Sequence, residues 1–447
     1  MNAFAGERAV VVGAGTSGRA AARALAEEGA RVLVTERGSI ADDDALRALG
    51  VEMATGGHRP EHLDGASLVV TSPGVAQSAE VLGWARERGL AIWSELELGA
   101  RLCTVPYVGI TGTNGKTTTT EIVAASLRAT GLDAIACGNI GHPFSLAARE
   151  ARDALAVEAS SFQLHFSQTF RPRVSALLNV ADDHLDWHGS RRAYVEAKAR
   201  IFELQAGDDV HVGNADDEEA ACVSRAARCR VVWFRLGPPA DQEVGFVDGD
   251  LVSRLGGEPE VHIGRPASET GGFRADAAAA TAVALSYGVP AEAIREALLQ
   301  VRPLPHRGST VATVDGVRFV DDSKATNPHA ALAALDGLRD VVLIAGGRSK
   351  GVDLSPLGEA AGRLSGVVAI GEAAGEIAEI FAGRVPAVHR AGSIEEAVRA
   401  AADQAVSGGT VLLAPACASQ DMFTDYRERG DRFAAAARSL QEERSVG

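Results

Sequence analysis

The sequence predicts an α/β protein of three domains, each built on a mostly parallel sheet with flanking helices. Its 447 residues exceed what one ordinary hydrophobic core organises, so several domains are expected. Short apolar strands alternate with helical segments along most of the chain, which is typical of parallel sheets covered by helices. Glycine-rich turns between a strand and a helix occur at residues 13–18 and again at 112–115, which suggests two separate ligand-binding sheets.

Composition limits the possible partners. The net charge of −15 repels nucleic acids and anionic membranes, so neither is expected to bind. The five cysteines contain no CxxC pair, which favours reduced thiols. No apolar run approaches the roughly 20 residues of a membrane span, and no signal peptide precedes the first strand. We therefore expect a cytoplasmic protein whose anionic ligands are held by local basic clusters.

The first domain, residues 1–102, opens with a dinucleotide-binding pattern. A strand at 9–12 leads into a GxGxxG turn made by Gly13, Gly15 and Gly18, and a strand at 31–35 ends at Glu36. Such a turn binds a diphosphate, and an acid about 20 residues later takes ribose hydroxyls. This predicts a Rossmann-like domain. Taken alone, the pattern indicates an NAD-dependent oxidoreductase, which stays open as an alternative, as does an ordinary solvated strand end at Glu36.

A phosphate-binding loop organises the second domain, residues 103–303. The stretch 108–130 predicts a strand, a turn with Gly112 and Gly115, and a helix beginning near Lys116. Lys116 is expected to neutralise phosphates and Thr117 to hold Mg²⁺. Ile110 occupies the place of the usual first glycine. A turn that only caps a core helix, or a nucleotide-binding switch protein, remain alternatives.

Polar residues follow the other strands expected in this domain. Strands are predicted at 133–136, 154–158 and 175–179. Because parallel strands end at one edge of a sheet, the groups at their ends should meet there. These groups are Asn139, Glu158, Asp182, Asp183 and His184. Residues 236–272, with a hairpin expected at Asp248–Gly249, should form structural edging without chemistry, and a helix is expected over 276–287.

The third domain, residues 304–447, begins in the RPLPHRG stretch. Strands are predicted at 317–320, 341–345, 367–370 and 411–414. Loops bearing Lys324, Lys350 and Ser419 follow three of them, and Asn327–Pro328 should cap a helix. Either these loops converge on an anion-binding edge, or each is a plain strand-to-helix connection.

Several strings together resemble one enzyme family. They are VVGAGTSG, TGTNGKTTT, VEASSFQL, NVADDHLDWH, DDSKATNP and APACASQDMFTDYRERGDRF. The chain is similar to the Mur ligases, the ATP-dependent amide-forming enzymes of peptidoglycan precursor synthesis, with the weakest match over 205–303. Within the family it looks most like the members that add D-glutamate to UDP-N-acetylmuramoyl-L-alanine. The resemblance implies a role in cell wall biogenesis, cell shape and cell division.

The resemblance also implies site residues by position. For ATP they are Gly112, Thr113, Asn114, Gly115, Lys116, Thr117, Thr118, Arg307 and Asp322. For the UDP-sugar they are Thr16, Ser17, Thr35, Glu36, Arg37 and Gly74, and for D-glutamate they are Thr326, Lys350, Ser419 and Tyr426. The implied catalytic residues are Lys116, Asn139, Glu158, His184 and Lys198. Asp276 is the only stand-in for asparagines that usually open its helix in the family.

Two Mg²⁺ sites are implied in the second domain. Thr117 and Glu158 would hold one ion, and His184 with a carbamylated Lys198 would hold the other. From the residues alone, a buried helix-capping acid stays an alternative for Glu158, and a lysine on a helix surface is the favoured interpretation of Lys198. A monomer is expected.

The chemistry expected of these residues is carboxylate activation. ATP converts a carboxylate to an acyl phosphate, and an incoming amine displaces the phosphate. Bringing the carboxylate and the γ-phosphate together requires cations between them. Within the family, MurC and the folylpolyglutamate synthetases share the central domain and remain alternatives.

Overall fold

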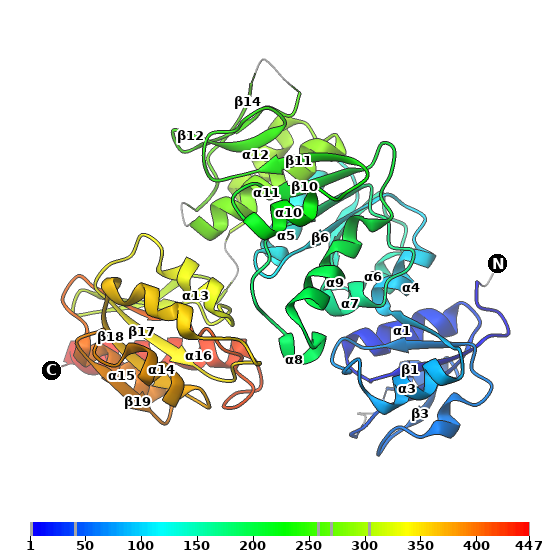
Figure 1. The fold of residues 1–447 in the computed structure, drawn as a ribbon, viewed down its shortest axis with the longest axis horizontal. Coiled ribbons are helices and arrows are strands. Elements are labelled where there is room, and N and C mark those ends of the chain that lie inside the picture. Colours follow the sequence, from blue (N-terminus) through cyan, green and yellow to red (C-terminus); the bar gives the residue numbers. More distant parts are fainter. Residues whose placement is uncertain (1–2, 40–42, 257–259, 269–270, 303–304, 447) are drawn as a thin grey trace. The chain divides into compact units, whose positions relative to one another are not determined.

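The computed structural model describes residues 3–39, 43–256, 260–268, 271–302 and 305–446. It contains three separate sheets, each with its own helices, and this confirms the predicted three-domain α/β class (Figure 1). Contacts divide the chain into two compact units. One holds the first two sheets, and the other holds the third sheet with the segment 181–189.

The first sheet is parallel, with the order β3-β2-β1-β4-β5. Its strands are β1 (Arg8–Val12), β2 (Arg31–Thr35), β3 (Glu52–Ala54), β4 (Leu68–Thr71) and β5 (Ala91–Ser94). Its helices are α1 (Thr16–Glu27), α2 (Asp44–Ala48), η1 (Pro60–Leu63), α3 (Glu80–Glu87) and α4 (Glu95–Leu102). At the turn after β1, a Cβ at Gly18 would lie 1.9 Å from the carbonyl oxygen of Gly13, so only glycine lets α1 start there.

The second sheet has nine strands in the order β14-β13-β12-β11-β10-β9-β6-β8-β7. The strands are β6 (Tyr107–Thr111), β7 (Ala134–Gly138), β8 (Ala154–Glu158), β9 (Val174–Leu177), β10 (Val210–Asn214), β11 (Arg230–Phe234), β12 (Glu243–Val247), β13 (Asp250–Ser253) and β14 (Val261–Gly264). In this order, the seven strands from β12 through β6 to β7 pair in parallel. Strands β13 and β14 add antiparallel pairs at the other end of the sheet. The expected hairpin is confirmed, with Asp248 and Gly249 both at positive φ between β12 and β13.

The helices that follow β6 in the sequence, up to the third domain, belong to the first compact unit except for α8 and the first two residues of α11. They are α5 (Lys116–Ala129), α6 (Phe144–Ala147), α7 (Ser161–His165), α8 (Leu185–His188), α9 (Arg191–Glu203), α10 (Glu218–Ser224), α11 (Gly271–Tyr287) and α12 (Ala291–Gln300). The alanine-rich α11 is buried along most of its length and begins five residues before the expected start. Asp276 therefore lies inside the helix, and Phe273 in the turn before it is buried as well.

The third sheet has the order β15-β16-β20-β17-β18-β19. Its strands are β15 (Ser309–Val314), β16 (Val317–Asp321), β17 (Val341–Gly346), β18 (Leu364–Ile370), β19 (Val388–Ala391) and β20 (Thr410–Leu413). Its helices are α13 (Pro328–Leu335), η2 (Ser355–Arg363), α14 (Ala374–Phe381), α15 (Ile394–Gln404) and α16 (Tyr426–Val446). The four predicted strands are confirmed, whereas β15 and β19, at the edges, were not predicted. Edge strands bury less apolar surface, so their sequence pattern is weaker.

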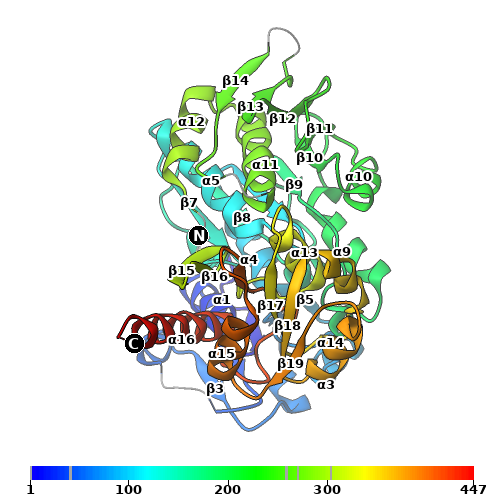
Figure 2. The ribbon, with the colours of Figure 1, turned by 90° about the vertical axis from the view of Figure 1, so that its left-hand side faces the viewer.

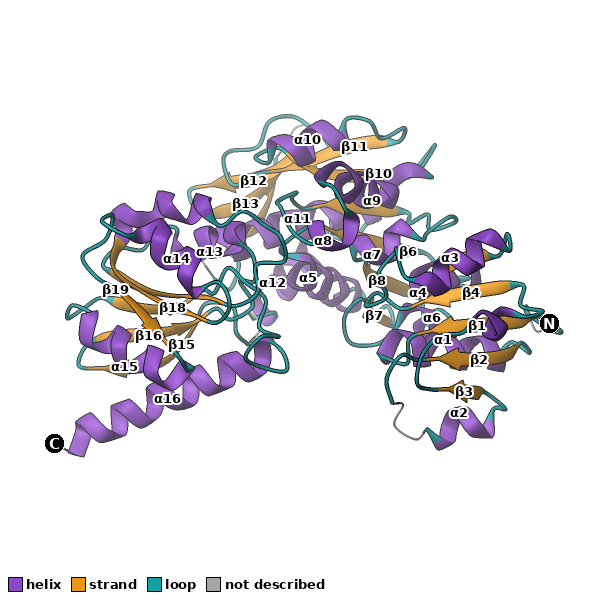
Figure 3. Cartoon of the chain, turned by 60° about the horizontal axis from the view of Figure 1, so that its bottom comes forward, coloured by secondary structure: helices purple, strands orange, loops and turns teal. Residues whose placement is uncertain are grey.

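Helices cover both faces of the third sheet. Figure 3 shows α13 and α14 on one side and α15 and α16 on the other, and two separate hydrophobic clusters fill the two layers. The long α16 runs beside α15 (Figure 2), and Phe433 packs on Phe319 of β16. The Asn327 side chain accepts the backbone N–H of Ala330, which confirms the expected cap of α13.

The five cysteines are free. In the part of the chain that the structure describes, no helix is long and apolar enough to cross a membrane.

A buried polar network crosses the core of the second domain. Ser175 of β9 lies 2.7 Å from Nδ1 of His211 on β10, and Nε2 of His211 lies 2.9 Å from Ser224 Oγ. Gln205, just after α9, accepts from Ser175 and donates to the carbonyl oxygen of Val210. The network joins the end of α9 to two strands. Burial lowers the pKa of His211 to about 3.

We predict that this network makes stability pH-dependent below neutrality. Because the folded pKa of His211 lies below the ordinary value of 6.5, the unfolded chain takes up more protons as the pH falls from 6.5 toward 3. At pH 5 the free energy of unfolding should be about 2 kcal/mol lower than at pH 6.5 from this group. Calorimetry of the wild type and His211→Gln at both pH values checks it. Equal pH slopes in the two proteins would contradict the assignment.

Candidate active site

The phosphate-binding loop joins β6 to α5. Gly115 is the residue before α5 and has φ of 85°. A Cβ there would lie 2.1 Å from Oδ1 of Asp276 on α11, so glycine is required for both reasons. Asp276 thus lies directly against the loop, and its contact with a nucleotide stays a prediction. The Lys116 ammonium donates to the carbonyl oxygens of Gly112 and Thr113, each at 2.9 Å.

Asn179 fixes the middle of the same loop. Its side chain accepts the backbone N–H of Asn114 at 2.8 Å and donates to the Asn114 carbonyl oxygen at 3.2 Å. Thr118, by contrast, is buried in α5. Asn179 was not predicted as a site residue, although it lies two residues after β9 and begins the NVADDH string. Its place after a strand next to β6 was the available signal.

The structure brings Glu158, Thr117 and Asn139 together. The Glu158 carboxylate accepts the Thr117 hydroxyl and the Asn139 amide, both at 2.8 Å. The Asn139 N–H also donates to the Glu158 carbonyl oxygen at 2.9 Å. Glu158 is not a helix-capping acid, because Ser160 caps α7.

These groups fit a magnesium ion. A hydroxyl and a carboxylate offer the oxygen ligands that Mg²⁺ prefers, and the rest of its shell normally comes from phosphate and water. Among the described residues, no group of three or more His, Cys, Asp and Glu side chains is gathered for a metal. A site with few protein ligands therefore suits an ion that arrives with a nucleotide.

Lys198 lies beneath the phosphate loop. Its side chain is 2% exposed, and Nζ donates to the Gly112 carbonyl oxygen at 2.7 Å. Nζ lies 4.6 Å from the ring centroid of Tyr194, whose hydroxyl is 3.0 Å from Thr113 Oγ1. The alternative of a surface lysine is therefore wrong. Tyr194 was missed, although it precedes Lys198 by four residues and so shares its helix face.

His184 falls in the other compact unit. It precedes α8 with φ of 54°, and Asp182 and Asp183 lie in the same segment. Its pairing with Lys198 in a second metal site stays a prediction.

In the first domain, Glu36 is bound by backbone groups. It accepts the N–H groups of Ala14, Arg37 and Gly38 at 2.8, 2.7 and 3.2 Å. Burial alone would raise the pKa of Glu36, but these N–H groups, that of Ala14 first, outweigh it and lower the pKa. Glu36 therefore holds the turn after β1 in place.

The other residues expected for a UDP-sugar lie around this turn. Thr16 and Ser17 open α1, whose first N–H groups suit a diphosphate, and Arg37 and Gly74 are exposed. The Thr35 hydroxyl is buried and lies 3.1 and 2.9 Å from Nδ1 of His58 and His62. The two histidines were missed because the segment that holds them, η1 and the residues before it, carries no motif.

Three loops of the third domain meet at the ends of β16, β17 and β20. Backbone bonds join them, from Ala416 to Ala325 at 2.8 Å and between Arg348 and Ala418 at 2.9 Å in both directions. Arg429 of α16 is fully buried and donates to the carbonyl oxygens of Ser323 and Cys417. These loops are therefore one assembly and not three plain connections.

Charged groups gather on this assembly. Lys350 forms an ion pair with Asp183 at 2.5 Å, with 12% of its side chain exposed, so it is not on a solvated loop. Asn327 donates to the other oxygen of Asp183 at 3.4 Å. Ser419 is buried, and the Lys324 ammonium lies 5.5 Å from the ring centroid of Tyr426. Thr326 lies in the same loop as Lys324.

Arg307 and Asp322 lie near the start of this domain. Burial raises the pKa of Asp322 to about 7, although the positive charge of Arg307 lowers it. Neighbouring Asp321 accepts from Nδ1 of His306 at 2.7 Å. Their expected reach to a nucleotide stays a prediction.

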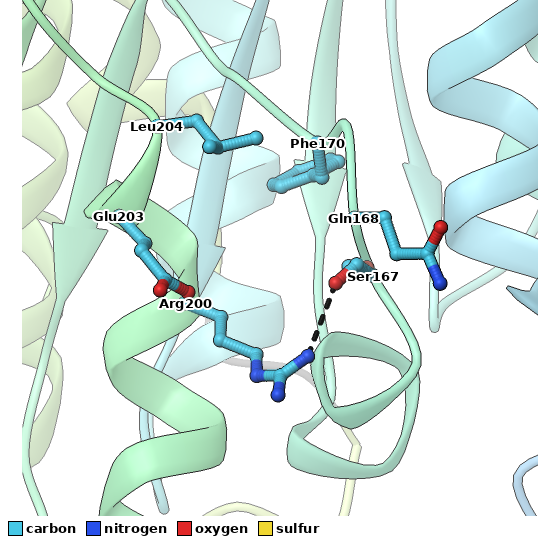
Figure 4. A pocket seen from close by; sticks show the side chains of 6 residues that line it. All are labelled: Ser167, Gln168, Phe170, Arg200, Glu203 and Leu204. Carbon is cyan, nitrogen blue, oxygen red and sulfur yellow. Dashed lines mark hydrogen bonds between the residues drawn. The ribbon is translucent and has the colours of Figure 1, made fainter.

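A pocket of about 280 Å³ opens elsewhere in the second domain (Figure 4). It is lined by Ser167, Gln168, Phe170, Arg200, Glu203 and Leu204. Arg200 points toward Ser167 in Figure 4 and donates to its carbonyl oxygen at 3.2 Å. None of the expected site residues lines this pocket, so the hollow is not the candidate active site.

Comparison with known proteins covers nearly the whole chain. Residues 7–94 match the MurD-like N-terminal domain of Mur ligases, residues 110–250 the Mur ligase middle domain, and residues 306–417 the glutamate ligase domain of Mur ligases. The UDP-N-acetylmuramoylalanine--D-glutamate ligase of Frankia casuarinae is 46% identical over 98% of this chain and 95% of its own. The protein of that name from Streptomyces avermitilis is 42% identical over 98% and 100%.

Solved structures show the same fold. The UDP-N-acetylmuramate-alanine ligase MurC of Thermotoga maritima has a TM-score of 0.61 at 19% identity, covering 97% of this chain and 99% of its own. The oxidoreductase and switch-protein alternatives are wrong, because the matches extend through all three domains. With near full-length identity above 40% and all three domains matched, the chain belongs to the Mur ligase family.

Proposed function

We propose that this chain joins D-glutamate to UDP-N-acetylmuramoyl-L-alanine in an ATP-dependent reaction through an acyl phosphate. The observation that carries the proposal is the Glu158 carboxylate, bonded to Thr117 and Asn139 at the mouth of the phosphate loop. Relatives that carry the name of this activity support the choice of substrates. In this proposal the reaction is a step of peptidoglycan precursor synthesis and takes place in the cytoplasm, where ATP is supplied. The enzyme acts as a monomer.

Each domain takes one substrate in this proposal. Residues 1–102 bind the UDP-sugar, 103–303 bind ATP, and 304–447 bind D-glutamate. The second boundary, between residues 303 and 304, lies outside the described residues. The assignment follows from the turn and Glu36 in the first domain, the phosphate loop in the second and the joined loops in the third.

The residues of the second domain bind and neutralise phosphate. Lys116 leaves its carbonyl partners to meet the β- and γ-phosphates, and the N–H groups at the start of α5 point to the same oxygens. When bound to Thr117 and Glu158, Mg²⁺ neutralises phosphate charge and so lets the substrate carboxylate approach. Asn139 keeps Glu158 oriented through its amide.

Lys198 is proposed to be carbamylated. Its Nζ and that of Lys116 both donate to the carbonyl oxygen of Gly112, so two positive charges converge on one acceptor. In carbamylation the neutral Lys198 amine adds CO₂ and a proton is released, so an anionic group replaces one ammonium. This change relieves the repulsion and supplies oxygens that would suit a second Mg²⁺.

D-Glutamate is proposed to bind at Lys350, Ser419, Tyr426 and Thr326. Its two carboxylates need donors, while the amine must remain free to attack. A lysine held in a rigid, nearly buried place is a strong donor for one carboxylate. The hydroxyls and the loop N–H groups suit the other carboxylate.

The function is tested by ADP release with UDP-N-acetylmuramoyl-L-alanine against a panel of D- and L-amino acids. We expect turnover with D-glutamate and a product mass equal to the sum of both substrates less water. Release of ADP in the absence of D-glutamate would contradict the proposal. So would release of ADP with L-alanine when the UDP-sugar carries no amino acid.

Lys198→Ala should be nearly inactive because the anionic oxygens are lost. Added acetate or formate should restore part of the rate, since a short carboxylate can occupy the vacated space. Intact mass of the native protein gives an independent readout of the carbamate. Rates that ignore added acid, in a folded variant, would count against the modification.

Lys350→Ala should raise the glutamate KM by roughly ten- to a hundredfold, because a charge-assisted bond of about 1.5 to 3 kcal/mol is lost. The affinities for the UDP-sugar and ATP should change little. Lys350→Arg, which keeps the charge next to Asp183, is the matched control. A glutamate KM within about twofold of wild type would remove Lys350 from this site.

A further inference from the structure

Glu95 is a buried carboxylate outside all the sites described above. It is the first residue of α4, and 1% of it is exposed. One oxygen accepts the backbone N–H of Ser145 on α6 at 2.6 Å. The other accepts from Nε2 of Gln163 on α7 at 3.4 Å. A single side chain therefore joins two short helices.

Both helices follow strands in the sequence, α6 after β7 and α7 after β8, and an expected site residue lies at the end of each strand. Asn139 lies six residues before Ser145, and Glu158 lies five residues before Gln163. The first connection is short and closed, since the Gly138 N–H donates to the His142 carbonyl oxygen at 2.9 Å. A displacement of α6 is therefore transmitted to Asn139.

The second connection is equally rigid. Gln163 Oε1 accepts both the N–H and the hydroxyl of Ser160, at 3.1 and 2.9 Å, and Ser160 is two residues from Glu158. The Gln163 N–H donates back to the Ser160 hydroxyl at 3.3 Å. This reciprocal cap fixes the turn that follows β8.

We infer that Glu95 is a positioning residue for the nucleotide and metal site, because it fixes the separation of the segments that carry Asn139 and Glu158. The inference rests on the proposed function of that site. Asn139 and Glu158 touch each other through two hydrogen bonds, so a shift of either segment misplaces the carboxylate that faces Thr117. Residues behind metal ligands commonly control affinity in this way.

The bond pattern favours an ionised carboxylate, since each Glu95 oxygen faces an N–H donor. Gln163 uses its oxygen for Ser160, so its amide nitrogen must face Glu95. A protonated Glu95 oxygen, or the nitrogen of a glutamine, would set donor against donor at this point. In the described part of the chain, the Glu95 carboxylate is bound by N–H donors of Ser145 and Gln163. No lysine or arginine in that part of the chain forms an ion pair with it.

Holding this charge in the protein interior is unfavourable. Burial raises the pKa of Glu95 to about 7, although Ser145 and Gln163 lower it. The folded value lies above the ordinary value of 4.5, so the folded state loses stability as the pH rises from 4.5 to about 7. The titratable group facing Glu95 is Cys137 of β7, whose thiol pKa is raised by burial and then by Glu95. The ionised Glu95 carboxylate thus positions the nucleotide and metal site, while its burial lowers the stability of the folded state.

Glu95→Gln tests the inference, with Mg²⁺-dependent ATP binding measured by calorimetry at pH 8. We expect the Kd for Mg·ATP to rise about tenfold. The melting temperature at pH 8 should stay equal or rise, because no charge is buried. A residue with a merely structural role would give the opposite pair of results.

Glu97→Gln is the matched control. Glu97 lies on the same helix, is 0% exposed, and accepts the N–H groups of Gln168 and Thr169, both at 2.8 Å, and Arg101 Nε at 2.7 Å. The residues bonded to Glu97 are not among the expected site residues. The control should lower the melting temperature and leave the Kd for Mg·ATP unchanged.

The double variant Glu95→Gln with Gln163→Glu provides a rescue. Glutamine at 95 can accept from Ser145 and donate to the new carboxylate at 163, and that carboxylate can still accept both Ser160 donors. Every hydrogen bond is restored, and only the bond between positions 95 and 163 has its donor and acceptor exchanged. We expect the Kd for Mg·ATP to return to within about twofold of wild type.

Two results would overturn the inference. One is a folded Glu95→Gln protein that binds Mg·ATP as tightly as wild type, and the other is a folded double variant that binds as weakly as the single variant. If the wild type itself bound no Mg·ATP, the proposed function of the site would fail instead. The pH dependence separates the cases further, since the ratio of variant to wild-type Kd should fall toward one below pH 7.

Discussion

The Glu158 carboxylate is the interaction on which the second domain depends. It accepts from Thr117 at the start of α5 and from Asn139 after β7, so one side chain joins the ends of three adjacent strands. In a parallel sheet these ends lie at one edge, but nothing in the sheet itself fixes their loops. Hydrogen bonds between the loops fix them here, and the oxygens expected to bind Mg²⁺ are the same atoms that form these bonds. Stability and the proposed ligand binding therefore share groups at this edge.

In the third domain, backbone hydrogen bonds and one buried cation hold the loops after the strands together. Arg429 donates to the Ser323 and Cys417 carbonyl oxygens, and it also donates to the Ser323 hydroxyl at 2.9 Å. Burial lowers the pKa of Arg429 to about 10, which leaves it charged at neutral pH. A planar guanidinium can bond several carbonyl oxygens at once, so it holds two loops with fixed geometry.

The sequence predicted the parts of this protein that depend on local pattern. Strand β8 and the strands of the third sheet that are buried on both faces were predicted because continuous apolar runs mark them. Site residues next to a strand end, such as Glu158 and Asn139, could also be placed. Asn179, Tyr194 and the histidines near Thr35 could not, because their hydrogen-bond partners lie 23 to 81 residues away in the sequence. The early start of α11 was missed because its first two residues, Gly271 and Gly272, are poor helix formers.

An overall charge of −15 makes the local arrangement of cations decisive. The lysines expected to meet anions are not free surface charges: Lys116 and Lys198 donate to loop carbonyl oxygens, and Lys350 pairs with Asp183. Such partners hold each ammonium in one place while leaving its charge to act on a ligand. Carbonyl dipoles are weaker partners than carboxylates, so an arriving phosphate can replace the contacts of Lys116 at little cost. At Lys350 a substrate carboxylate must instead compete with a full negative charge. Binding of the amino acid is thereby expected to depend on the closer fit of both its carboxylates, which favours a dicarboxylic substrate over a simple one.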